Sequence, residues 1–269
     1  MKALVLFFLL TAQAEAYTLN NNFGGAFKDS NVDVLVDEQT TCPNVGLTVY
    51  ELQDIVSEAV ENFWNKVPTS NLRLSAAGFS APVANISDGK LCSATDDACI
   101  SAAMSAGNLI PPVNEIIIAC NTLNTNFGGA NVLAVTIPNK FSGKKIEGAI
   151  ILLNEDPSSS FSNLSRDDKV SVIAHEIGHA IGLGHAEPDH DEALMYYRTV
   201  KLRRNLAQDD MDGVSYLYPV IVDGCGLFGT LDSTKRDPPY WQLGITLGLM
   251  ILLSELRRLF NRPKTGTPA

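Results

Sequence analysis

The stretch AHEIGHAIGLGHAEPDHDEALMYY, residues 174–197, holds all four histidines of this 269-residue chain. Two of them, His175 and His179, are four residues apart in a segment whose pattern predicts a helix. At that spacing both imidazoles project from one helix face and can reach one metal ion. Glu176 lies beside the first, where its carboxylate can approach a metal-bound water. This is the H-E-x-x-H arrangement, in which histidines hold zinc and glutamate is the general base.

His185 extends the pattern to H-E-x-x-H-x-x-G-x-x-H. A helix continuing past His179 would carry His185 away from the metal. Gly182 and Gly184 lie between them, and glycine tolerates the backbone needed to end a helix and turn the chain back. We therefore expect three histidine ligands and a fourth position open to water. Chance is a weaker explanation for eleven residues than for five, and a histidine pH switch would not explain the glycines. His190 has no such reason, and we assign it to the surface of the following loop.

Met195, in the run ALMYY, follows the third histidine. Alone it would be read as ordinary core filler, but after this histidine pattern it resembles the Met-turn of the metzincins. Together, HEIGHAIGLGH and ALMYY resemble the matrixin, or matrix-metalloproteinase-like, branch of the metzincin zinc endopeptidases. LAQDDMDGVSYLYP (206–219) resembles the matrixin C-terminal helix with its paired aspartates, Asp209 and Asp210.

The resemblance implies an α+β fold, α/β-like in its layers. We expect a twisted mixed sheet packed with a first helix and a zinc-binding active-site helix, then a C-terminal helix. Patterning elsewhere agrees, because apolar residues recur at helical spacing over 47–67, with Thr48 and Glu51 as a capping box. Residues 82–114 are rich in Ser, Ala, Asp and Gly and are interpreted as a long loop. Runs typical of strands occupy residues 32–38, 71–79, 115–120, 131–138 and 146–155.

The activity implied is hydrolysis of protein or peptide substrates by zinc-activated water. Zinc would be held by His175, His179 and His185, with Glu176 as the general base. The alternative is a zinc-bearing surface adhesion or scaffold protein that has lost catalysis; the presence of Glu176 argues against it. Ca²⁺ suits the fold, although no loop shows a decisive ligand spacing. We expect a monomer, and the net charge of −10 argues against nucleic-acid binding.

The chain also departs from the matrixin pattern. Ala186 follows the third histidine, where matrixins usually carry Ser or Thr. With His190 as the one remaining histidine, a second, structural zinc site is not expected. Tyr197 stands two residues after the methionine, where the related astacins and serralysins place a metal-facing tyrosine. It is a candidate accessory residue at the metal, with packing as the alternative interpretation.

Both ends of the chain are typical of export and anchoring. Residues 1–16 have the charged, apolar and small-residue order of a secretory signal peptide, and residues 17–223 form the expected catalytic domain. A linker at 224–239 precedes an apolar run at 240–254, which we interpret as a transmembrane or sorting helix. The basic tail, 255–269, suits a cytoplasmic flank. An interfacial or docked helix is the alternative.

Five cysteines fit the oxidising environment of an exported, extracellular or cell-surface protein. Four lie in the main body, and we favour the pairs Cys92–Cys99 and Cys42–Cys120, although four cysteines allow three pairings. Cys225 is left over in the linker, next to Gly226. With the apolar helix and the arginines that follow, it resembles a bacterial sorting tail of the myxosortase type. That resemblance implies that Cys225 is a processing or anchoring position.

Overall fold

The chain folds into a five-stranded sheet packed with helices. The computed structural model describes residues 17–20, 25–198 and 205–220. The strands are β1 (Asn31–Asp37), β2 (Arg73–Ser80), β3 (Ile116–Asn121), β4 (Ala134–Ser142) and β5 (Lys145–Asn154). The α-helices are α1 (Val49–Asn62), α2 (Asp97–Ser105), α3 (Arg166–Ala180) and α4 (Gln208–Leu217). Short 3-10 turns are η1 (Trp64–Lys66), η2 (Asn124–Asn126) and η3 (Ser160–Asn163). The α+β prediction is confirmed, and each predicted strand is present.

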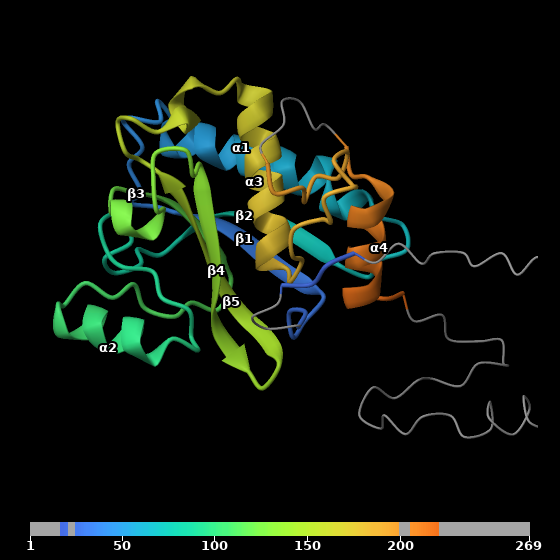
Figure 1. Ribbon diagram of the computed structural model, residues 1–269, viewed down its shortest axis with the longest axis horizontal. Coiled ribbons are helices and arrows are strands. Elements are labelled where there is room, and N and C mark those ends of the chain that lie inside the picture. Colours follow the sequence, from blue (N-terminus) through green and yellow to red (C-terminus); the bar gives the residue numbers. More distant parts are fainter. Residues whose placement is uncertain (1–16, 21–24, 199–204, 221–269) are drawn as a thin grey trace, which may run out of the picture. The chain divides into compact units, whose positions relative to one another are not determined.

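The sheet is mixed, with the strand order β2-β1-β3-β5-β4. The pairs β1–β2, β1–β3 and β3–β5 are parallel, whereas β4 runs antiparallel to β5. β4 is therefore an edge strand, and it also contacts α3. This position brings the backbone of an edge strand next to the helix that carries the first two histidines (Figure 1).

Alternating residues of the central strands face two different cores. On β3, Ile116 and Ile118 pack in the cluster that includes residues of α1 and α3. Ile117 and Ala119 point to the opposite face, into a smaller cluster with Leu91 and other residues of the segment between β2 and β3. Both faces of the strand are thus buried, which explains the continuously apolar run IIIAC.

The first helix is fixed at both ends. The Thr48 hydroxyl accepts the Glu51 amide at 3.2 Å, and the Glu51 carboxylate accepts the Thr48 amide at 2.8 Å, which confirms the predicted capping box. Just beyond the helix, the indole of the buried Trp64 donates to the Ala174 carbonyl of α3 at 2.8 Å. Because that carbonyl belongs to the residue before His175, α1 and η1 help to position the histidine-bearing helix.

The segment between β2 and β3 is not a loop throughout, as the sequence suggested. It contains α2, which begins where the Asp96 carboxylate accepts the Cys99 amide at 3.0 Å. Asp at an N-cap and several alanines favour a helix even where apolar periodicity is weak. The predicted disulfide Cys92–Cys99 joins the segment before α2 to its first turn.

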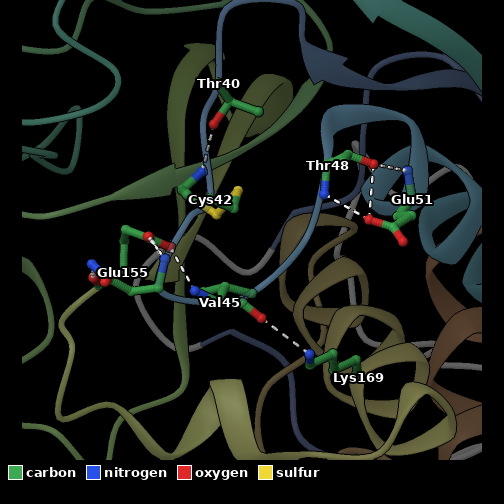
Figure 2. The surroundings of a disulfide bond; sticks show 9 residues. Thr40, Cys42, Val45, Thr48, Glu51, Glu155 and Lys169 are labelled. Carbon is green, nitrogen blue, oxygen red and sulfur yellow. Dashed lines mark hydrogen bonds between the residues drawn. A yellow bond between two sulfur atoms is a disulfide. The ribbon is translucent and has the colours of Figure 1, made fainter.

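The second predicted disulfide, Cys42–Cys120, ties a loop to the end of β3 (Figure 2). The same loop is held from two other directions. The Glu155 carboxylate at the end of β5 accepts the Val45 amide at 3.2 Å, and the Lys169 ammonium donates to the Val45 carbonyl at 3.2 Å. Since Lys169 lies on α3, this loop links the sheet to the helix that carries His175 and His179 (Figure 2).

The predicted signal peptide, residues 1–16, lies outside the described residues. So do Cys225, the 224–239 linker, the 240–254 helix and the 255–269 tail. Among the residues described, no helix is long and apolar enough to cross a membrane. The predictions for both ends of the chain stay predictions.

Candidate active site

The histidine-bearing helix, α3, begins with a capped first turn. The Ser165 hydroxyl accepts the Asp168 amide at 3.2 Å and donates to the Asp168 carboxylate at 2.7 Å. Asp167 adds a second acidic side chain there, which is favourable at a helix N-terminus. Buried residues such as Ile173 and Ile177 lie along the helix and fix its rotation against the sheet.

The end of α3 turns the chain back as the glycines predicted. The Gly182 amide bonds to the His179 carbonyl at 3.1 Å, and the Leu183 amide bonds to the Gly178 carbonyl at 3.0 Å. These two bonds form a Schellman motif, with Gly182 in the left-handed region at φ +109°. A β-carbon on Gly182 would also lie 2.4 Å from the Gly25 carbonyl oxygen. Gly182 therefore serves both the reversal and a close backbone approach.

Three imidazoles meet at this reversal. One ring nitrogen from each of His175, His179 and His185 lies within 4.8 Å of the others, and the Nε2 atoms of His179 and His185 are 3.2 Å apart. The Nδ1 atom of His175 bonds the Leu194 carbonyl at 2.7 Å, and that of His179 bonds the Leu183 carbonyl at 2.9 Å. Because a carbonyl only accepts, both Nδ1 atoms carry the proton, and each Nε2 keeps a lone pair for a ligand bond.

Contacts that the sequence did not predict hold the loop bearing His185. The Thr18 carbonyl accepts the Gly184 amide at 3.0 Å, and the Thr18 hydroxyl donates to the His185 carbonyl. On the other side, the buried Tyr218 hydroxyl donates to the Ile181 carbonyl at 2.7 Å. Two chain segments, one before β1 and one after α4, thus fix the third histidine. No local sequence pattern marks either contact.

Met195 forms a floor under the histidine helix. It is buried, and a β-carbon built on Gly178 would lie 2.3 Å from its sulfur, so the methionine packs directly against α3 between the first two histidines. The turn is held by Asp210, whose carboxylate accepts the amides of Leu194 at 2.7 Å, Met195 at 3.0 Å and Ala207 at 2.8 Å. Burial raises the pKa of the Asp210 carboxyl, although the three amides oppose that shift.

Glu176 lies beside the imidazoles and is almost completely buried. The Thr136 hydroxyl of β4 reaches its Oε2 atom at 2.5 Å. Burial raises the pKa of the Glu176 carboxyl, while His179 and the Thr136 hydrogen bond act in the opposite direction. Such a carboxyl is suited to accept a proton. The three histidines and Glu176 line a cleft of about 870 Å³ between α3 and β4.

Three further residues singled out in the sequence, Tyr197, His190 and Ala186, have different surroundings. Tyr197 is about half exposed and lines the same cleft, with its ring centroid 4.7 Å from that of Tyr196. His190 does not belong to the imidazole cluster. It is more covered than the surface position we expected, with 14% of its side chain exposed and its Nδ1 atom 3.7 Å from the Glu192 carboxylate. Ala186 is buried, and its amide bonds the Met195 carbonyl at 2.8 Å.

Comparison with known proteins agrees with this geometry. The family model of the matrixin peptidases matches residues 122–219, which include β4, β5, α3, the Met-turn and α4. Residues 122–219 therefore resemble a matrixin domain. This likeness supports a zinc metalloprotease at family level, and the three clustered imidazoles fit zinc.

Two plant proteins resemble this matrixin-like domain. Metalloendoproteinase 2-MMP of Arabidopsis thaliana is 39% identical over 88 residues, which is 32% of this chain and 23% of that protein. Metalloendoproteinase 1 of Glycine max is 49% identical over 57 residues, which is 20% of this chain and 17% of that protein. The chain thus spans less than a quarter of the length of these relatives.

The stability of the metal-free protein should depend on pH because of His185. Burial, followed by the charge of His179, lowers the pKa of His185 from 6.5 to about 4. A pKa that folding depresses contributes stability above the unfolded value, and that stability is lost as the pH falls through the folded value. We expect the urea concentration at the unfolding midpoint of the metal-free protein to decrease as the pH is lowered from 6.5 to 4. A His185→Gln variant should show a smaller fall, and an identical fall would contradict this assignment.

Proposed function

We propose that this chain is a zinc-dependent endopeptidase that hydrolyses peptide bonds with Glu176 as the general base. The observation that supports the proposal most strongly is the convergence of three imidazoles beside a buried carboxylate. A purely structural zinc site fills four positions with protein ligands and needs no base. Here three histidines meet at a cleft, and within the described residues the metal-competent cluster at that cleft contains only these three.

His175, His179 and His185 would hold the metal through their Nε2 atoms. A zinc ion held there would polarise a scissile carbonyl and lower the pKa of a water molecule to about 7. Glu176 takes the proton from the attacking water and passes it to the leaving amine. The carbonyls of Leu194 and Leu183 fix the orientation of the first two imidazoles throughout, because each accepts from an Nδ1 proton.

The substrate and the location belong to the same proposal. The cleft runs beside β4, an edge strand that can pair with an extended peptide, so protein or peptide substrates fit it. Two disulfides suit an oxidising compartment. We propose that the chain is exported and tethered at the cell surface through the 240–254 segment, with Cys225 as the processing or anchoring position. Tyr197 stays a candidate accessory residue, and Ca²⁺ a candidate second ion.

Metal analysis combined with a protease assay tests this proposal. The purified protein should contain one zinc per chain and cleave casein or gelatin. A chelator or a hydroxamate should abolish the cleavage, and added zinc should restore it after chelation. The activity should be recovered from the surface fraction of producing cells. Zinc at one per chain without any cleavage would favour the inactive adhesion or scaffold protein instead.

A further inference from the structure

We infer that Thr136 is a positioning residue that holds the general base, Glu176, through its hydroxyl group. The expected kinetic effect of this residue rests on the proposed endopeptidase function. The contact between Thr136 and Glu176 is independent of that function. Thr136 lies on the edge strand β4, and its hydroxyl oxygen is 2.5 Å from Oε2 of Glu176 and 3.2 Å from the Glu176 carbonyl oxygen.

The two distances show which acceptor takes the proton. A threonine hydroxyl has one proton, so it can make one strong donation at a time. A distance of 2.5 Å is typical of a hydroxyl donating to an ionised carboxylate, and such bonds are about twice as strong as neutral ones. The 3.2 Å approach to the carbonyl is a secondary contact. The hydroxyl therefore donates to the side chain of Glu176.

Burial makes this bond important for the carboxylate. Glu176 is 8% exposed, and a buried carboxylate without a partner is costly. In the described part of the chain, the Thr136 hydroxyl supplies the hydrogen bond that reaches the Glu176 side chain. The bond selects one rotation of the carboxylate and stabilises its ionised form.

Thr136 also connects the base to the substrate-binding strand. Its side chain points toward α3, because Ala134, two residues earlier on the strand, packs in the core shared with that helix. The backbone of Thr136 pairs with Ile151 of β5, so the hydroxyl is held by the sheet rather than by a loop. A peptide seated on β4 would therefore meet a base that is fixed to the same strand.

Thr136→Val tests this inference, because it replaces the hydroxyl with a methyl group of similar size. With zinc-loaded full-length protein and a peptide substrate, kcat should fall about 10- to 100-fold while KM changes less than about twofold. Thr136→Ser keeps the hydroxyl and should stay within about threefold of the unchanged protein. A Thr136→Val enzyme with kcat within twofold of the original, or a Ser variant as slow as the Val variant, would overturn the inference.

Thr40→Val is a matched control for the loss of a buried hydrogen bond. The buried Thr40 hydroxyl accepts the Cys120 amide at 2.9 Å (Figure 2). This variant should unfold at a lower temperature than the original protein and leave both kcat and KM unchanged. A fall in kcat as large as that of Thr136→Val would show that lost stability, not lost positioning, explains the kinetics.

Unfolding of metal-free protein provides a measurement that needs no peptidase activity. Thr136→Val should lower the urea midpoint when Glu176 is present, and lower it clearly less in a Glu176→Ala background, where the hydroxyl can still donate to the backbone carbonyl of residue 176. Equal decreases in the two backgrounds would show that no such bond exists. If the original protein cleaves nothing while this coupling is present, the proposed function fails and the contact stands. If the protein cleaves normally and the coupling is absent, the proposed function stands and the inference about Thr136 fails.

Discussion

Replacing Glu176 with glutamine should abolish peptide hydrolysis and leave zinc bound. The amide of glutamine has nearly the shape of the carboxylate, so the helix and the three imidazoles should stay in place. It cannot take a proton from water, and general acid–base catalysis contributes about 10²- to 10⁴-fold to rates. We expect kcat to fall by at least that range, with one zinc per chain by metal analysis.

Glu187→Gln is the matched control, since Glu187 is an exposed residue two positions after the third histidine. It removes one negative charge from the same region without touching the cleft, and its kcat should match that of the original chain. Near-normal cleavage of casein or gelatin by Glu176→Gln would exclude the assigned mechanism. Loss of zinc from that variant would instead show that the substitution disturbs the metal site.

Asp210→Asn should cause the largest loss of stability among single substitutions near the site. One carboxylate oxygen accepts the Leu194 and Ala207 amides, and the other accepts the Met195 amide. An asparagine side chain has one acceptor oxygen, so at least one buried amide would face an NH₂ group. The substitution loses hydrogen bonds to a charged acceptor and leaves a buried amide unsatisfied. Together these effects should lower the free energy of unfolding by about 2–4 kcal/mol. Tm should fall by roughly 5–15 °C in a calorimetric scan.

Asp212→Asn is the control for this prediction. Asp212 lies on the same helix but is exposed, and its carboxylate accepts a hydrogen bond from the Gln208 side chain at 2.7 Å. Its Tm should change by about 1–2 °C at most, as for most surface substitutions. An unchanged Tm for Asp210→Asn would show that water replaces the lost acceptor and that the Met-turn does not depend on this residue.

Much of the fold was predictable because its signals are local. The helical stripe of α1, the capping box of Thr48 and Glu51, and the β-branched run of β3 each depend on residues a few positions apart. The same holds for the reversal after α3, where glycine at a single position permits the left-handed backbone. The helix α2 was missed, because a nine-residue helix that is mostly exposed needs no strong apolar stripe.

The candidate site was predictable to a similar extent. Spacing alone brings His175 and His179 onto one face, and Gly182 allows His185 to return to them. The position of Tyr197 in the cleft also agrees with its place after Met195, although its role at the metal stays a prediction. The partial burial of His190 depends on the folding of its loop, which no sequence pattern describes.

By itself the sequence determined which residues can bind a metal, which carboxylate lies beside them, and how the helix carrying them ends. Only the tertiary structure decided what holds that chemistry in place. Thr136 reaches Glu176 across 40 residues of sequence, Asp210 reaches the Met-turn across 15 and 16, and Tyr218 reaches the end of α3 across 37. The physical reason is that spacing along a helix follows from backbone geometry, whereas these hydrogen bonds form only after separate elements have packed together.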